Sequence, residues 1–146
     1  MSKTIHDLLK KKGFEVYSVN PDSSIKESLQ LMAEKRIGFV PILENGTIVG
    51  LYSERDFARL IAARDDVALD TPIREVMVSP VYFIRSHQSI DEGMAVMSAM
   101  HFRHLPVLNG DQMIGVVSIG DVIRDALLEM DYTIEQLENI LWANLV

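Results

Sequence analysis

The chain has 146 residues, 48% of them hydrophobic, and contains no cysteine. This length suffices for one domain or for two half-domains sharing a core, and the absence of thiols excludes disulfide scaffolds and thiolate zinc sites. The net charge of −7, from 14 basic and 21 acidic residues, disfavours duplex nucleic acid or a membrane surface as a partner. No stretch reaches the roughly 20 apolar residues of a membrane span. Residues 1–6 lack the apolar segment of a signal peptide, so we expect a cytoplasmic protein.

The chain contains an internal repeat with a period of 65 residues. A shift by this period aligns residues 16–61 with 81–126 without a gap, and twelve of the 46 aligned positions are identical. A fixed period indicates that one structural unit occurs twice. A unit of this size cannot bury its apolar faces alone, so we expect the two copies to pack through a pseudo-twofold axis.

The two copies are expected to contain the same elements in the same order. The helix after the first strand opens with an S-x-x-E capping box in each copy, and each hairpin turns at Asn-Gly, which tolerates positive φ. The expected elements are strands at 15–19 and 81–85, helices opened at 24–27 and 89–92, hairpins at 39–51 and 105–117, and closing helices at 54–63 and 119–129.

Two segments lie outside the aligned repeat. In the connector, Thr71 is expected to be an N-cap and Pro72 the first residue of a short helix that reaches Met77. Residues 4–9 are its counterpart before the first copy, with three extra residues after them. An amphipathic helix is expected over 133–145, packing on the domain or across a dimer. Its apolar face comprises Ile134, Leu137, Ile140 and Leu141.

Each copy carries the motif Gly-x-x-Ser-x-x-Asp where its last strand runs into its closing helix, at 50–56 and 115–121. A serine N-cap leaves neighbouring N–H groups for an anion, which the helix dipole also favours. A carboxylate one turn into the helix can accept both hydroxyls of a ribose. The alternative is that serine and aspartate only cap their own helix. The repetition of the motif at one register favours ligand binding.

These motifs, with the Pro-Ile and Pro-Val of the hairpins, resemble those of stand-alone bacterial pairs of cystathionine-beta-synthase (CBS) domains, called Bateman modules. The resemblance covers residues 5–128. It implies an α/β (α+β) fold of two pseudo-symmetric CBS repeats packed as one module, with repeat 1 at 5–64, repeat 2 at 71–130 and a C-terminal helix in 131–146.

The resemblance also implies a function: a regulatory sensor of energy status or a signal-transduction protein, not an enzyme. Its ligand would be an adenosine compound (AMP, ADP, ATP, NAD or S-adenosylmethionine), and two modules would pair into a disc-like homodimer. Methionine- and leucine-rich surface on the helices at 25–35 and 90–100 exceeds what a small core consumes, so we expect the dimer to bury these helices and the elements that follow them. The alternative is a ligand-free dimerisation or protein-interaction module of the same fold.

Two ligand clefts between the repeats follow from the resemblance. The Asp56 cleft would use Ser53, Arg55, Tyr82, Phe83, Arg103, His104 and Pro106. The Asp121 cleft would use Ser118, Tyr17, Ser18, Ile37, Gly38, Val40 and Pro41. Because Gly38 and Phe39 stand where the second copy has Arg103 and His104, we expect a mononucleotide phosphate to prefer the Asp56 cleft. The Asp121 cleft would tolerate a less charged or bulkier ligand, such as part of a dinucleotide.

No catalytic or metal site is expected. His101 and His104 lack the further His or Cys partners of a zinc site. Asp56 and Asp121 belong to different clefts, so they do not form the carboxylate pair of a hydrolase. The sequence contains no Ser-His-Asp order, HExxH or P-loop. The lysine run 10–12 could reach a phosphate, although a short charge run is usually a solvated face.

Overall fold

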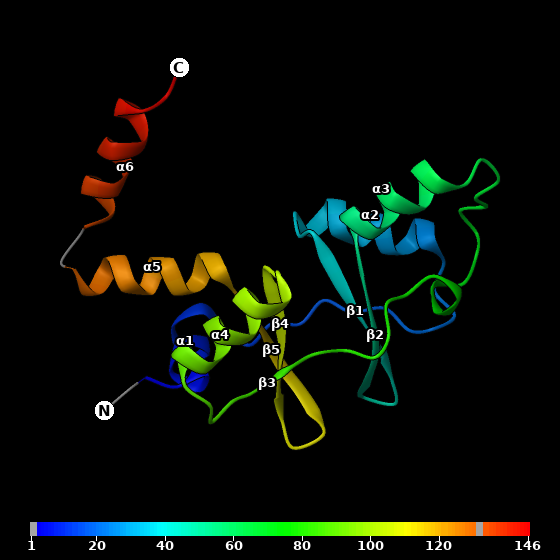
Figure 1. Ribbon diagram of the computed structural model, residues 1–146, viewed down its shortest axis with the longest axis horizontal. Helices are drawn as coiled ribbons and strands as arrows, with labels where there is room; N and C mark the ends of the chain where they lie inside the picture. The colour runs from blue at the N-terminus through cyan, green and yellow to red at the C-terminus, as the bar shows by residue number, and fades with distance from the viewer. Residues whose placement is uncertain (1–2, 131–132) are drawn as a thin grey trace.

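The computed structural model describes residues 3–130 and 133–146 (Figure 1). Residues 1–2 of the N-terminal segment and 131–132, where the C-terminal segment was expected to begin, lie outside the described residues. The elements in chain order are α1 (Ile5–Lys12), α2 (Ile25–Lys35), β1 (Phe39–Glu44), β2 (Thr47–Ser53), α3 (Glu54–Ala63), the 3₁₀ turn η1 (Ile73–Glu75), β3 (Ile84–Arg85), α4 (Ile90–Met100), β4 (His104–Asn109), β5 (Gln112–Ser118), α5 (Ile119–Glu129) and α6 (Ile134–Ala143). This order confirms the expected mixture of helices and strands in two copies of one unit.

Each repeat has its own small sheet. β1 pairs antiparallel with β2, and β4 pairs antiparallel with β5, while β3 runs parallel to β4. In the first repeat, the counterpart of β3 is a single parallel bridge from Val19 to Ile42. The expected five-residue strands are therefore too long. In the second copy only Ile84 of this segment is fully buried, and Tyr82 and Phe83 before it are exposed, so little holds the preceding residues to the sheet.

The two hairpins share one register. Phe39 pairs with Ser53 and His104 with Ser118, and both ladders contain an irregularity at the same place. The first turn has positive φ at Asn45 (52°) and Gly46 (81°), as its sequence predicts. β2 and β5 each run on to the serine that also caps the next helix. The strand end and the helix start therefore coincide at one residue in each repeat.

The segment before each repeat packs into the core of the other repeat. Ile5, Leu8 and Leu9 of α1 belong to the core cluster of the second repeat, whereas Ile73 of η1 belongs to that of the first. α1 accordingly lies beside α4, α5 and β5 (Figure 1). This exchange holds the two repeats together, because the core of each repeat is completed by the segment that precedes the other repeat in the chain.

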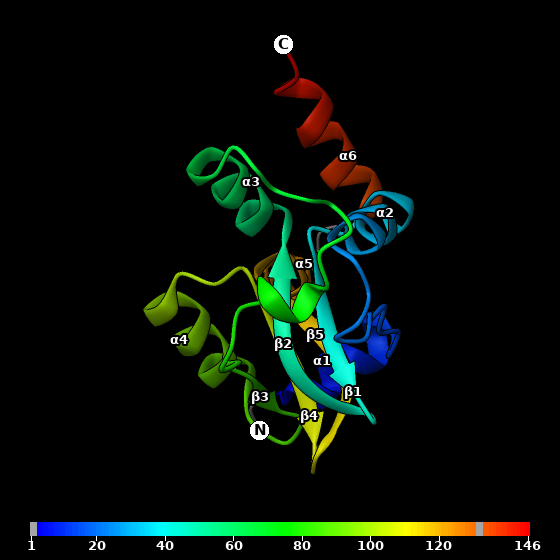
Figure 2. The ribbon, with the colours of Figure 1, turned by 90° about the vertical axis from the view of Figure 1, so that its right-hand side faces the viewer.

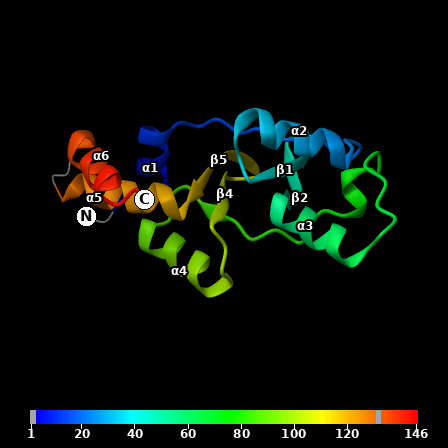
Figure 3. The same ribbon diagram turned by 90° about the horizontal axis from the view of Figure 1, so that it is seen from above.

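The hairpins of the two repeats lie side by side at the centre of the molecule (Figure 2), where β2 contacts β5. Seen from above, α1, α4 and α5 lie at one end and α2 and α3 at the other (Figure 3). None of the helices in the described part of the chain has the length and apolar content needed to span a membrane.

The connector differs from its expected form. The Thr71 hydroxyl and N–H both donate to the carbonyl of Ala68, at 2.5 and 3.1 Å, so Thr71 does not cap a following helix. Pro72 precedes the turn without a side-chain cap, and the turn spans only Ile73–Glu75. The predicted N-cap and the predicted helix to Met77 are therefore wrong.

The C-terminal helix α6 begins after a capping box at Thr133 and ends at Ala143, two residues earlier than expected. Its expected apolar face does not pack on the repeats: Ile134 and Leu141 are each 71% exposed, and only Leu137 is half-buried. Figure 1 shows α6 extending away from the rest of the chain. Of the two expected roles, packing on the domain is not observed.

Candidate functional site: two strand-to-helix junctions

The two Gly-x-x-Ser-x-x-Asp motifs form the same junction. The hydroxyl of Ser53 accepts the N–H of Asp56 at 3.0 Å, and the hydroxyl of Ser118 accepts that of Asp121 at 3.0 Å. In return, Oδ2 of each aspartate accepts the N–H of its serine, at 2.9 and 2.8 Å. Both pairs are thus complete capping boxes. Because capping uses only Oδ2, the second carboxylate oxygen is left for another donor.

The Asp56 junction is open. Its carboxylate is half-buried, and Oδ2 also accepts the Ser53 hydroxyl at 2.8 Å. Within the described ranges, no lysine, arginine or histidine forms an ion pair with Asp56. Nearby, the Tyr52 hydroxyl is buried without a hydrogen-bond partner among these residues. Burial, with a smaller effect of the Asp56 charge, raises the pKa of Tyr52 to about 12.

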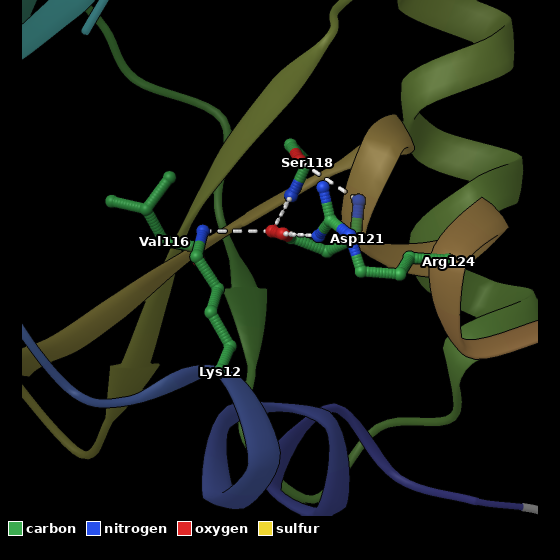
Figure 4. A network of polar contacts seen from close by, with 5 residues as sticks. All are labelled: Lys12, Val116, Ser118, Asp121 and Arg124. Atoms are coloured by element: carbon green, nitrogen blue, oxygen red, sulfur yellow. Dashed lines mark hydrogen bonds and ion pairs between the residues drawn. The ribbon is translucent and has the colours of Figure 1, made fainter. Parts of the chain in front are cut away.

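The Asp121 junction is occupied by cationic side chains of the same chain (Figure 4). Asp121 is only 8% exposed. Lys12 Nζ lies 2.7 Å from its Oδ2, and Arg124 Nη1 lies 3.4 Å from its Oδ1. Burial alone would raise the pKa of Asp121, but the hydrogen bond and charge of Lys12, with the bonds from Ser118, outweigh it and lower the pKa. Asp121 is therefore ionised and paired at neutral pH.

Arg103 and His104 lie beside the Asp121 junction. The carbonyl of Arg103 accepts the N–H of Ile119 at 3.0 Å, and His104 pairs with Ser118 across the ladder. Burial lowers the pKa of His104; the charges of Lys12 and Arg103 lower it further, and Asp121 opposes them. The His104 ring also lies 4.8 Å from the ring of Phe39, which pairs with Ser53 of the Asp56 junction. The expected use of Arg103 and His104 by the Asp56 cleft, and the phosphate preference that follows from it, stay predictions.

The corresponding residue of the first repeat, Gly38, also lies beside the start of the closing helix of its own repeat. The carbonyl of Gly38 accepts the N–H of Glu54 at 3.0 Å, so Gly38 lies beside the start of α3. The reason is the hairpin register, which keeps the start of the first hairpin strand next to the end of the second within one repeat. The expected use of Ile37 and Gly38 by the Asp121 cleft stays a prediction.

Several other expected ligand residues are buried in the hydrophobic core or pack against it. Val40, Pro41 and Pro106 are buried within β1 and β4, and Ile37 packs against the first core cluster. Buried strand residues cannot contact a ligand through their side chains without a rearrangement of the core. Ser18, by contrast, is exposed.

The expected aromatic residues lie at the surface. The Tyr17 hydroxyl donates to Glu15 at 2.8 Å, and this contact raises the pKa of Tyr17. Tyr82 is 52% exposed, with its ring centroid 5.7 Å from that of Phe102. Phe83 lines a cleft between the hairpin turns. The rings of Tyr82 and Phe83 are exposed and accessible to a planar ligand, whereas Tyr17 is half-buried with Lys35 Nζ 4.9 Å from its ring centroid. The one expected ligand residue on α3 besides Asp56, Arg55, is exposed.

Two clefts lie outside the acidic junctions. One, of about 390 Å³ between α2 and the start of α3, is lined by Leu29, Met32, Ala33, Arg36, Ile37, Gly38 and Glu54. The other, of about 280 Å³ between the repeats, is lined by Thr47, Ile48, Val49, Ser79, Pro80, Val81, Phe83, Leu108 and Asp111. Neither includes Asp56 or Asp121. In the described part of the chain, no group of three or more His, Asp or Glu side chains is arranged to hold a metal ion.

The contact of Lys12 with Asp121 was missed by sequence reasoning, which treated the lysine run as a solvated face. The available signal was the length of the segment before the first copy. Its three extra residues extend α1 by one turn to Lys12. Arg124 was also overlooked: its spacing of three residues from Asp121 permits the contact, although Arg59 at the same spacing from Asp56 forms no ion pair with it in the described residues.

Two pseudo-symmetric repeats that share their cores, each with a serine-capped acidic junction, define a tandem-repeat module. The CBS-domain family model matches residues 4–63 and 73–127. The chain therefore belongs to the CBS-domain family and contains two CBS domains.

Similar proteins agree with this membership. A CBS-domain protein from Agrobacterium tumefaciens has a crystal structure that is 30% identical with a TM-score of 0.79, covering 85% of this chain and 99% of that one. The CBS domain-containing protein YhcV of Bacillus subtilis is 28% identical over 108 residues, which are 74% of this chain and 76% of YhcV. CBSX2, solved in complex with AMP, is 22% identical with a TM-score of 0.71, covering 87% of this chain and 98% of that one; this likeness shows the fold.

Some relatives are much longer than this chain. A 33.4 kDa protein of Thermofilum pendens is 32% identical over 125 residues, which are 82% of this chain but 41% of that protein. The CBS pair is therefore found both in proteins of similar length and as part of larger ones.

Proposed function

We propose that this chain is a cytoplasmic regulatory module that binds an adenosine nucleotide such as AMP at the Asp56 junction. The observation that carries the proposal is the state of the Asp56 carboxylate. It is held by its capping box at the start of α3, half-buried, with Oδ1 unused and no cation in ion-pair distance in the described ranges. A preorganised acceptor of this kind suits a diol.

The chemistry of the junction fits the parts of a nucleotide. The two hydroxyls of a ribose can donate to one carboxylate, as they do in dinucleotide sites. The start of α3 favours negative charge, which suits a phosphate. Exposed Arg55 on the first turn adds a guanidinium that can bind phosphate in two hydrogen bonds.

The comparisons support a regulatory function over catalysis. CBS-domain pairs are generally regulatory, and the family member CBSX2 was solved with AMP. We propose that ligand binding acts through packing: it biases how the two repeats, or two copies of the module, contact one another.

We also propose that two copies form a homodimer through α4 and α5. Apolar side chains on these helices remain exposed in the single chain: Met94 (44%), Met100 (37%), Ile123 (51%) and Leu128 (45%). Exposed apolar surface of this kind favours a protein interface. If no ligand binds, this face supports the second candidate function, an interaction module of the same fold.

Thermal unfolding with a panel of ligands tests the proposal. AMP, ADP, ATP, NAD and S-adenosylmethionine are compared with GMP and buffer. A ligand at about 100 times its Kd stabilises the folded state by about 2.7 kcal/mol, which is a shift of several degrees in Tm for a chain of this size. At least one adenosine ligand should raise Tm, and the rise should be clearly smaller in Asp56→Asn. No shift with any of them at millimolar concentration would contradict the proposal.

A further inference from the structure

The segment that precedes each repeat packs one apolar side chain against the glycine that begins a Gly-x-x-Ser-x-x-Asp motif. Leu9 of α1 packs against Gly115, where an added Cβ would meet the leucine side chain at 3.0 Å. Met77, after η1, packs against Gly50 in the same manner. Leu9 and Met77 are therefore structural equivalents, each seated on the glycine that opens a Gly-x-x-Ser-x-x-Asp motif.

Beyond this point the two segments diverge. After Met77 the chain is extended, and the N–H of Val78 donates to the carbonyl of Leu51 at 2.7 Å. After Leu9 the chain stays helical for one more turn, to Lys12. The carbonyl of Val116, which is the equivalent of Leu51, accepts Lys12 Nζ at 2.8 Å instead. A lysine side chain thus replaces a backbone N–H at the second junction.

The same ammonium group reaches the acidic residue. Lys12 Nζ bonds Asp121 Oδ2 at 2.7 Å while Oδ2 also accepts the N–H of Ser118 at 2.8 Å. With Arg124 at Oδ1, both carboxylate oxygens of Asp121 have partners from this chain. Among the described residues, only Ser53 is hydrogen-bonded to the Asp56 carboxylate. The two junctions therefore differ in whether their carboxylate is available to an incoming diol.

A second ion-pair cluster fixes the helix that carries Lys12. Asp125, one turn after Asp121 and 7% exposed, pairs with Lys11 at 3.0 Å and with Lys3 at 3.3 Å. The first repeat has Leu60 at this position. α1 is thus anchored to α5 independently of Lys12, whose side chain is 37% exposed. Lys12 can leave Asp121 by a rotamer change, without unfolding α1.

We propose that Lys12 is an internal competitor for the ligand at Asp121, a specificity-determining residue that makes the two junctions unequal. The inference rests on the proposed function. Its ammonium occupies the carboxylate that a ribose needs, so the first nucleotide on each chain binds at Asp56. Asp121 accepts a nucleotide only when Lys12 is displaced.

Isothermal titration with AMP tests this proposal in a background that isolates the second junction. Asp56→Ala removes the carboxylate of the open junction. The test variant carries Lys12→Met in addition to Asp56→Ala. Asp56→Ala/Lys10→Met is the matched control, because Lys10 lies on the same helix and is exposed. Asp56→Ala/Lys12→Arg restores a cation at the position. The Lys12→Met double variant should bind AMP at least ten-fold more tightly than Asp56→Ala, while the Lys10→Met and Lys12→Arg double variants should not.

The other outcomes separate two failures. If the wild type binds AMP but all the Asp56→Ala variants bind it equally, Lys12 is not a competitor and the proposed function stands. If Lys12→Met weakens binding, Lys12 contacts the ligand and the proposal is overturned. If the wild type does not bind AMP, the proposed function fails and this inference fails with it. Circular dichroism of each variant confirms that it is folded.

Discussion

The ring of Phe39 lies 4.8 Å from the imidazole ring of His104, centroid to centroid, and the two residues hold the same position in the two repeats. Each pairs with the capping serine of its own junction, Ser53 or Ser118. The contact therefore joins the two junctions across the pseudo-twofold axis.

The protonation of His104 should make the fold sensitive to pH. Burial, with the charges of Lys12 and Arg103, lowers the pKa of His104 in the folded state. The unfolded chain then binds a proton first as the pH falls, so stability is lost from about pH 6.5 down through the folded-state pKa. Urea unfolding of His104→Phe between pH 5 and 7.5 should show a smaller loss than the wild type.

The exposed His87 provides the control for this experiment. His87→Gln should keep the pH dependence of the wild type. If His104→Phe and His87→Gln gave the same slope of unfolding free energy against pH, the imidazole of His104 would not be the group responsible.

The exchange of segments between the repeats predicts that α1 stabilises the second repeat. Leu9 is 0% exposed in that core, so Leu9→Ala removes buried methyl groups and leaves a cavity. We expect a loss of about 2–5 kcal/mol in the free energy of unfolding, measured by urea denaturation. Leu69→Ala in the connector, where Leu69 is 41% exposed, should change it by less than about 0.5 kcal/mol. Similar losses from both variants would contradict the packing of α1.

The proposed dimer face gives a separate prediction. Ile123 on α5 is 51% exposed in the single chain, so Ile123→Glu should place a charge inside the interface and leave the monomer fold intact. Light scattering coupled to gel filtration should show a dimer for the wild type and a monomer for Ile123→Glu. Leu69→Glu, at a similarly exposed apolar position away from α4 and α5, should stay dimeric. A monomeric wild type would refute the dimer itself.

Local sequence signals predicted the elements that surround the junctions. The S-x-x-E and S-x-x-D spacings located the starts of α2, α3, α4 and α5, and the ends of α3 and α5 agree with those expected. The Asn-Gly turn at Asn45 was equally local, because its two residues alone meet the demand for positive φ. Such signals depend on a few neighbouring residues, which is why one sequence suffices to read them.

The features that distinguish the two junctions depend on long-range contacts. The position of α1 in the far repeat is set by packing over more than 100 residues of chain, as Lys12 and Asp121 show. Likewise, the pairing of His104 with Ser118 follows from the register of the second hairpin. Thr71 does not cap a helix because its hydroxyl donates to the carbonyl of Ala68 in the same turn. The composition of the segment does not show which of these two local hydrogen bonds forms.

Titration of the wild type and of Asp56→Asn with AMP, at fixed salt, measures directly whether the Asp56 carboxylate binds the ribose. The amide oxygen in Asp56→Asn can still accept the N–H of Ser53, so the helix cap and the fold should be preserved. The negative charge is lost, however, which weakens the charge-assisted hydrogen bonds to the ribose, each worth about 1.5–3 kcal/mol. We expect AMP to bind the wild type and to bind Asp56→Asn at least ten-fold more weakly. Asp121→Asn should bind AMP about as tightly as the wild type, because Lys12 already pairs with that carboxylate. Equal affinity of the wild type and Asp56→Asn, or no binding by either, would contradict the proposed binding at Asp56.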